Sequence, residues 1–449
     1  MTNPLPCRPG WLLYDRNSVV RNLTTVLLIG CLASSLRAAD LDGEPINYAK
    51  APAHNAVARL QERIEAGKGK LTYEKTFGYL PSLLRELNVP VSSQMLVFSK
   101  TSLQQARIGP QKPRSIFFNE DVYVGFCQRG DVLEVSAVDP NLGLVFYTLD
   151  QKSPSKPVFT RQQDACLICH GSSATEGLPG NVVRSLYPDS DGFPILAFGS
   201  TRVDHSTPLK QRWGGWYVTG TSGKQTHLGN LILEDKTPPE QIDNSAGSNV
   251  TDLKDRFPLA SYLSPHSDIV ALMVLEHQAE AQNRITRANL LTRRALYDET
   301  EMNKALGRPE NYHSESTESR IKNAGEPLVK YFLFSDEARL TEKVQGTSGF
   351  EHQFPQRGPR DGRGRSLRDF DLQHRLFKYP CSYLIYSTAF DALPVLVKDY
   401  VYRRLWEVLS GKDTSESFAH LSAGDRQAIL EILLATKPNL PSYWKSGVR

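Results

Sequence analysis

The residues with the clearest chemistry lie together in the run Cys-Leu-Ile-Cys-His, at Cys166, Cys169 and His170. Two thiols three positions apart can each add to one vinyl group of a porphyrin, and the histidine that follows can bind the iron of the same group. With six cysteines and ten histidines in 449 residues, this order rarely arises by chance. We therefore predict one covalent haem c, with Cys166 and Cys169 as its anchors and His170 as the proximal iron ligand.

Two other kinds of site use the same cysteine spacing. A thioredoxin-like redox pair lies close to a βαβ pattern, and the flanking residues 159–164 and 171–173 show no such pattern. A structural zinc ion needs further ligands, usually a second closely spaced pair, and the other cysteines of this chain are isolated. Haem attachment is therefore favoured over both alternatives.

A haem iron needs either a second protein ligand, which suits electron transfer, or an open position, which permits ligand chemistry. His277 is the first candidate for the distal ligand, and Met273 lies four positions before it on the same face of a predicted helix. His227 is the alternative distal ligand, because it follows the Trp- and Gly-rich run 212–220, which would suit a strand against a flat macrocycle. His205, His266 and an open position remain as further alternatives, and each of these side chains could equally be ordinary core.

Arginines can neutralise the two propionates of a haem by bidentate pairing. Four arginines close to the motif in the sequence are candidates for this role: Arg161, Arg184, Arg202 and Arg212. A second group holds five arginines between Arg357 and Arg368, with only Asp361 opposing them. It predicts either a solvated loop, which is favoured, or a docking site for an acidic partner or an anionic membrane surface.

The N-terminal residues have the pattern of an export signal. A polar lead with several arginines precedes the apolar stretch 23–33, and small residues follow up to Ala38 and Ala39. The apolar stretch is too short for a permanent span, which needs about 20 residues. We predict that residues 1–39 are a signal peptide and that the protein is periplasmic or otherwise exported. Residues 28–31 also resemble a lipobox, so lipidation of Cys31 is the one predicted route to a membrane.

The charge and the remaining cysteines narrow the function classes. The net charge of +4 falls to +1 without residues 1–38, which hold four arginines and one aspartate, so no global basic field predicts nucleic-acid binding. The rest of the chain is long enough for two or three packed domains, well beyond a minimal electron carrier. Outside the leader and the motif, Cys127 and Cys381 remain, either as a disulfide or as two buried thiols.

The hydrophobic pattern predicts an α+β protein with an antiparallel, β-rich N-terminal and central region around the haem segment and a mainly helical C-terminal region. We divide it into a helical lead-in at 40–92, a β-rich haem c domain at 93–235 and a mainly helical region at 236–449 with an Arg-rich loop at 343–368. Strands are expected at 94–99, 115–118, 122–127, 132–138, 144–149, 194–198, 213–219 and 228–233. Helices are expected at 53–68, 80–87, 268–303 with Ser267 as N-cap, 326–334, 366–377, 393–409 and 423–435.

At Cys166 to His170 the chain resembles the c-type cytochromes, and the wider pattern resembles the large exported monohaem cytochromes of environmental bacteria. That pattern comprises 159–161, 178–180, 212–220 and 264–270. The strands on both sides of the motif, and the absence of a nearby methionine after it, distinguish the chain from a class I cytochrome c domain. The resemblance implies transfer of single electrons between redox proteins of the cell envelope. A peroxidase-like haem oxidoreductase with an open distal site and a haem-based sensor are the alternatives.

Overall fold

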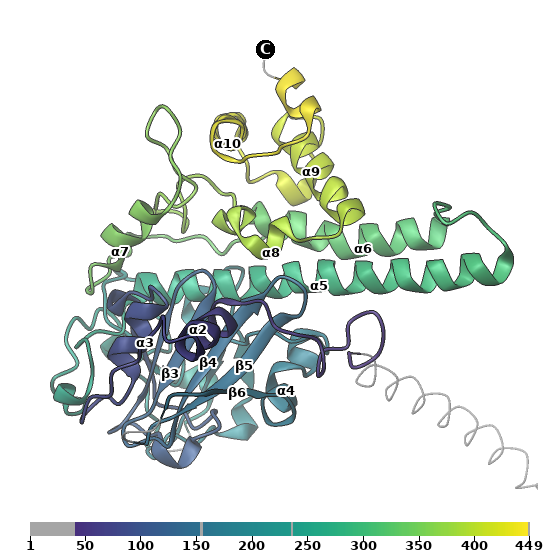
Figure 1. Cartoon of the computed structure of the whole chain (residues 1–449). Coiled ribbons are helices and arrows are strands. Elements are labelled where there is room, and N and C mark those ends of the chain that lie inside the picture. Colours follow the sequence, from purple (N-terminus) through teal and green to yellow (C-terminus); the bar gives the residue numbers. More distant parts are fainter. Residues whose placement is uncertain (1–40, 153–155, 235–236, 448–449) are drawn as a thin grey trace, which may run out of the picture.

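A computed structural model describes residues 41–152, 156–234 and 237–447 (Figure 1). An antiparallel sheet occupies the first half of these residues and helices occupy the second half, which confirms the predicted α+β class. The predicted signal peptide and the lipobox at Cys31 lie outside the described residues. None of the helices within the described part of the chain is both long and apolar enough to cross a membrane.

The sheet has seven strands in the order β6-β5-β4-β3-β2-β1-β9, and all neighbours are antiparallel. Most of the strands follow one another along the chain through short turns, as the alternating Val, Phe and Tyr residues predict. The strands are β1 (Met95–Val97), β2 (Arg114–Phe118), β3 (Val122–Phe126), β4 (Val132–Asp139), β5 (Gly143–Asp150), β6 (Phe159–Gln162) and β9 (Trp216–Tyr217).

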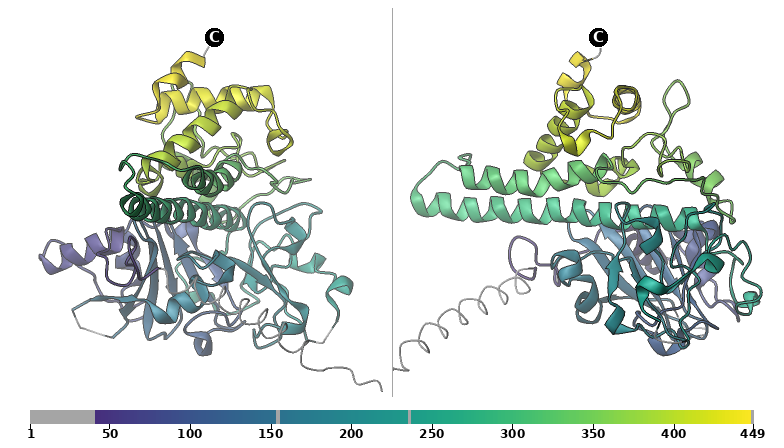
Figure 2. Two further views of the ribbon diagram at one scale, coloured as in Figure 1. Left: turned by 90° about the vertical axis from the view of Figure 1, so that its right-hand side faces the viewer. Right: turned by 180° about the vertical axis from the view of Figure 1, so that it is seen from behind.

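The two faces of this sheet bury different layers, because successive side chains of a strand point to opposite sides. One face packs against the lead-in helices α2 (Ala56–Glu65) and α3 (Leu80–Glu86). The other face, with Phe118, Tyr123 and Phe146, packs against the segments that follow β6 and against the long helix α5 (Ile269–Leu306). Figure 2 shows the lead-in helices and the segments after β6 on opposite sides of the sheet.

The segments after β6 contain less strand than the sequence predicts. Residues 194–198 form part of a 3₁₀ turn at Leu196–Phe198, and no strand is present at 228–233, where Asn230 has a positive φ of 66°. A short two-stranded sheet pairs β7 (Arg184–Leu186) with β8 (Ser200–Arg202) instead. Positive φ and proline interrupt the extended backbone in this region, so irregular structure replaces the expected ladder.

Helix α5 (Ile269–Leu306) runs for 38 residues and pairs with α6 (Glu315–Phe332). The two helices form an antiparallel hairpin that extends beyond the sheet at one end (Figures 1 and 2). Asp268, not Ser267, caps α5, because its carboxylate accepts hydrogen bonds from the backbone N–H groups of Val270 and Ala271. The Ser267 hydroxyl instead donates to the Tyr217 carbonyl and so joins the helix start to the sheet.

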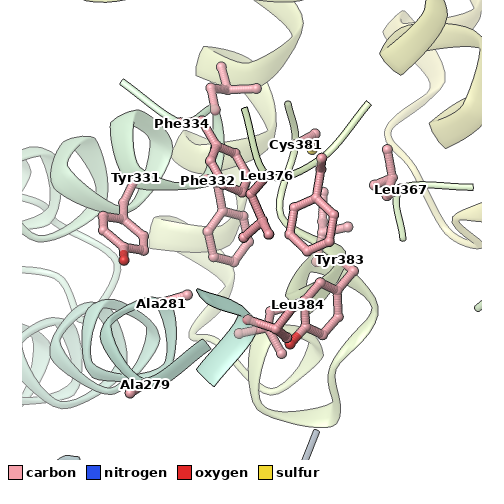
Figure 3. Packing of buried hydrophobic residues seen from close by; sticks show 14 of the residues in the cluster. Ala279, Ala281, Tyr331, Phe332, Phe334, Leu367, Leu376, Cys381, Tyr383 and Leu384 are labelled. Atoms are coloured by element: carbon pink, nitrogen blue, oxygen red, sulfur yellow. The ribbon is translucent and has the colours of Figure 1, made fainter. Parts of the chain in front are cut away.

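The remaining helices lie on the side of α5 away from the sheet (Figure 1). They are α7 (Phe350–Gln353), α8 (Thr388–Asp391), α9 (Val395–Leu409) and α10 (Ala423–Thr436), so the predictions at 393–409 and 423–435 are confirmed. Residues 366–377 are not helical: Leu372 has a φ of 57° and Phe370 forms a β-bridge with Phe377. Figure 3 shows Phe332 of α6 packed with Phe334, Leu376 and Tyr383 beside α5.

Candidate functional site

The cysteines and the histidine of the motif share one short helix, α4 (Asp164–His170). Positions three and four apart meet on one face of a helix, so Cys166, Cys169 and His170 are presented together. The Cys166 and Cys169 thiols are both free, the first half-buried and the second exposed. Burial raises the pKa of the Cys166 thiol to about 11. A redox-active pair needs a lowered thiol pKa, so this environment is unlike that of a thioredoxin-type site.

His170 is oriented by a backbone carbonyl. Its Nδ1 atom donates to the Gly180 carbonyl oxygen at 2.9 Å, and its ring packs against Phe146 with 4.8 Å between centroids. Burial lowers the pKa of His170, so the ring is neutral near pH 7. The Nε2 atom has no hydrogen-bond partner among the described residues. A neutral imidazole with its other nitrogen held by a carbonyl is the form that binds a metal in proteins.

The Gly180 carbonyl is itself held in place by α5. The side chain of Asn283 accepts from the Asn181 backbone N–H at 3.0 Å and donates to the Asn181 carbonyl at 2.8 Å. A Cβ atom at position 180 would lie 2.3 Å from the Asn283 Oδ1 atom, so the close approach needs glycine. Asn283 on α5 therefore fixes the backbone at Gly180 and Asn181, and the Gly180 carbonyl in turn orients His170.

Cys166, Cys169 and His170 line a cavity of about 440 Å³ between α4, the sheet and α5. Its walls are largely apolar, with the rings of Tyr123, Phe146 and Trp216 and the side chains of Leu275 and Ala279. This volume is within the usual range for small-molecule and cofactor sites. The residues present thus form a mainly apolar lining that includes two thiols and one imidazole.

One wall of the cavity is polar. Arg114 on β2 forms an ion pair with Glu134 on β4, with 2.6 Å between Nη2 and Oε2. Both residues line the cavity, and their side chains are 19% and 17% exposed. Lys100 is the other cation of the lining among the described residues. Neither Arg114 nor Glu134 was among the site residues that we predicted.

The first predicted distal ligand, His277, does not line this cavity. It is completely buried on α5, where its Nδ1 atom lies 2.9 Å from Nδ1 of His205 and its Nε2 atom 2.9 Å from the Ser382 hydroxyl. Rings of Tyr331 and Phe334 stack on the two histidines. The structure thus brings His277 and His205 together, but apart from Cys166, Cys169 and His170.

The other predicted ligands also lie outside the cavity lining. His227 is buried against the Trp213 ring with 5.1 Å between centroids, and its Nδ1 accepts from the Gly229 backbone N–H. Met273 is a core residue of α5, and His266 precedes the start of that helix. Apart from His170, none of the described residues that line the cavity is a histidine or a methionine.

The four arginines near the motif in sequence make internal contacts or lie outside the cavity lining. Arg161 donates to the carbonyls of Ala51 and Tyr48, and Arg202 pairs with Glu280 at 2.9 Å. Arg212 forms a buried ion pair with Glu276. Arg184 is exposed on β7.

The Arg-rich loop is largely paired within the protein. Arg365 binds Asp361 and Glu431, while Arg368 and Arg357 both pair with Glu120. These arginines therefore have partners within the chain, and their ion pairs hold the loop against the rest of the protein. Cys127 and Cys381 are both free and buried, so the structure has two thiols there and no disulfide.

Sequence reasoning missed the polar wall for an identifiable reason. Arg114 is the first residue of β2 and Glu134 is the third residue of β4, so both resemble the polar residues found near the ends of ordinary strands. The available signal was the alternation itself, because Arg114 shares a face with Ile116, and Glu134 shares one with Ser136. That parity places both charged residues on the face that carries Phe146.

No protein-family model matches this chain, and neither the curated proteins nor the solved structures include a significant match. No group of three or more metal-ligating side chains is present within the described parts of the chain. The site is therefore interpreted from its own residues.

Proposed function

We propose that the protein is an exported c-type cytochrome with one covalent haem c, which transfers single electrons between redox proteins of the cell envelope. One observation carries this proposal: Cys166, Cys169 and His170 line the same largely apolar cavity, and the Nε2 atom of His170 has no hydrogen-bond partner among the described residues. A zinc site finds less support, because no further cysteine or histidine lines the cavity among the described residues.

Each of these residues has a distinct role in the proposal. Cys166 and Cys169 are the covalent anchors, and His170 is the proximal iron ligand, held in the correct tautomer by the Gly180 carbonyl. Phe146 and Trp216 line the cavity and would exclude water from the bound group. When bound, haem supplies an iron that changes between the ferrous and ferric states.

A second candidate function is a haem oxidoreductase with an open distal position, such as a peroxidase-like enzyme. One observation favours it: the described lining contains no second histidine or methionine, but does contain Arg114 and Glu134. An electron-transfer centre usually has two axial ligands, whereas ligand chemistry needs an open position.

The absorption spectrum of protein produced in a host that exports and matures c-type cytochromes tests the proposal. We expect one haem that stays attached after acid–acetone extraction, and its loss in Cys166→Ala/Cys169→Ala. The matched control is Cys127→Ala/Cys381→Ala, which removes two buried thiols outside the cavity lining. The proposal is wrong if the protein without Cys166 and Cys169 retains the covalent chromophore.

Carbon monoxide then separates the two functions. Slow or absent binding to the reduced protein supports a six-coordinate electron carrier, and prompt binding supports the oxidoreductase.

Cell fractionation tests the localisation. The expected result is protein without its signal peptide in the periplasmic fraction. We expect the same distribution for Cys31→Ser, because we favour soluble export over lipidation.

A further inference from the structure

Arg114 has N–H donors that bind no other group in the described parts of the protein. Its one ion pair joins Nη2 to Oε2 of Glu134 at 2.6 Å. Its Nε atom is buried and has no hydrogen-bond partner. A guanidinium carries five N–H donors, and a buried donor without a partner costs about 1–3 kcal/mol. That Nε atom lies against Gly125 of β3, whereas Nη1 is not buried and has no hydrogen-bond partner among the described residues. Arg114 lines the cavity, so a partner for its remaining Nη donors could lie there.

Glu134 is held firmly enough to act as a fixed support for Arg114. Its Oε1 atom accepts from the Ser102 hydroxyl at 3.1 Å and from the Gln104 amide at 3.0 Å. Glu134 thus has three donors when Arg114 is included. The carboxylate is satisfied and positions one edge of the guanidinium, while the other donors of Arg114 stay available.

Gly125 provides the space for this arrangement. It lies on β3, between the strands of Arg114 and Glu134, and is paired with Glu134 in the sheet register. A Cβ atom at position 125 would lie 2.3 Å from Nη2 and 2.8 Å from Nε of Arg114. Any other residue would therefore displace the guanidinium, which makes Gly125 a positioning residue.

The charge of the cavity lining is positive overall. Lys100 and Arg114 face a single carboxylate, Glu134. A concave site with low-dielectric walls concentrates this field and attracts anions. The lining is thus suited to a mainly apolar ligand that carries an anionic oxygen group.

We propose that Arg114, positioned by Glu134 and Gly125, is a binding site for an anionic oxygen group, either a carboxylate or a small oxyanion. The planar fork of arginine binds these groups with charge-assisted hydrogen bonds. Two sources supply this chemistry: a propionate of the bound haem or a free oxyanion such as nitrite. The first source rests on the proposed function, and the second needs only the cavity.

The test compares Arg114→Gln with Arg320→Gln in haem-loaded protein. Arg320 forms an ion pair with Asp298 at 2.8 Å and does not line the cavity. Arg320→Gln therefore serves as the control, because it also removes one paired arginine. If a propionate is bound, Arg114→Gln lowers the reduction potential, because an uncompensated carboxylate favours the ferric state, and nitrite affinity is unchanged. If a free oxyanion is bound, the nitrite dissociation constant rises about tenfold or more.

A haem-free arm distinguishes this proposal from the proposed function. In Cys166→Ala/Cys169→Ala protein, sodium acetate or nitrite should raise the thermal midpoint, and the additional change Arg114→Gln should abolish that rise. If the purified wild-type protein contains no haem, the proposed function fails, and this arm still decides whether Arg114 binds anions. Ionic strength is kept constant with sodium chloride, because screening alters surface ion pairs.

Gly125→Ala keeps the test informative if Arg114→Gln does not fold. It retains both charges and moves only the guanidinium, so we expect the same changes as for Arg114→Gln, in smaller measure. A purely structural role for Arg114 would lower the thermal midpoint without changing the potential or the anion response. The proposal is wrong if both variants match Arg320→Gln in the reduction potential, the nitrite affinity and the acetate response.

Discussion

His205 and His277 lie with their Nδ1 atoms 2.9 Å apart, in a stack closed by the rings of Tyr331 and Phe334. Two neutral imidazoles can share a hydrogen bond only if one donates and the other accepts, so the pair requires a defined tautomer on each ring. The Ser382 hydroxyl then meets His277 on its other nitrogen. His277 therefore joins α5 to His205 and Ser382. Neither histidine lines the cavity of His170.

His277→Ala is expected to lower stability and to leave the visible spectrum of the proposed haem unaltered. The substitution removes two hydrogen bonds and opens a space inside the core, which together cost about 2–4 kcal/mol. Urea unfolding measures the loss, and the visible spectrum of the folded protein measures the iron environment. A shift from low to high spin in folded His277→Ala would instead establish His277 as the distal ligand.

Asn283→Ala is expected to make the side chain of His170, the proposed proximal ligand, more mobile. The change removes both hydrogen bonds to the backbone of Asn181 and so frees the Gly180 carbonyl that orients His170. We expect a loss of about 1–2 kcal/mol in unfolding free energy and a changed reduction potential. Asn289→Ala is the control, since it removes a hydrogen bond from the same helix to Pro140. Equal potentials in the two variants would show that Asn283 has no influence on the site.

Acid should destabilise the protein through its buried histidines. Burial lowers the pKa of His227 to about 4 and also lowers the pKa of His205, whereas an unfolded histidine titrates near 6.5. The unfolded state therefore binds protons first, and stability is complete above about pH 6.5 and falls as the pH decreases towards 4. Each residue contributes up to about 1.4 kcal/mol per pH unit in this window. Urea titrations from pH 7 to 4 measure it.

A matched pair of variants tests the origin of that pH dependence. His227→Asn should reduce the slope between pH 6.5 and 4, because one buried titrating ring is removed. His352→Asn should keep the slope, since His352 has a side chain that is 80% exposed. An undiminished slope in His227→Asn would assign the acid sensitivity to other groups.

The buried ion pair of Arg212 and Glu276 should be costly to break from one side. Arg212→Met leaves the Glu276 carboxylate buried, where Trp213 Nε1 at 3.2 Å is its remaining donor. Loss of one partner of a buried pair costs about 3–5 kcal/mol. Adding Glu276→Gln to Arg212→Met should recover part of the loss in a thermal unfolding series. No recovery would mean that the arginine acts through its bonds to the carbonyls of Thr207 and His205.

The strands and the long C-terminal helices were predictable because local patterns encode them. Alternating apolar residues at 122–127 and 132–138 became β3 and β4, and the apolar run that starts at Ile269 became α5. Residues 366–377 were wrongly predicted as helix, since their apolar spacing is satisfied by packing and not by helical hydrogen bonds. The cap of α5 was misplaced by one residue, because Ser267 and Asp268 have the same capping chemistry.

The sequence by itself determined the α+β class and the one short segment that carries two thiols and an imidazole, because both depend on residues close together along the chain. The tertiary structure decided which distant side chains meet that segment. It placed Arg114, Glu134 and Gly125 at the cavity and put His277 against His205. Strand register and helix packing bring such residues together, and these depend on the whole buried surface, which no single stretch of sequence specifies.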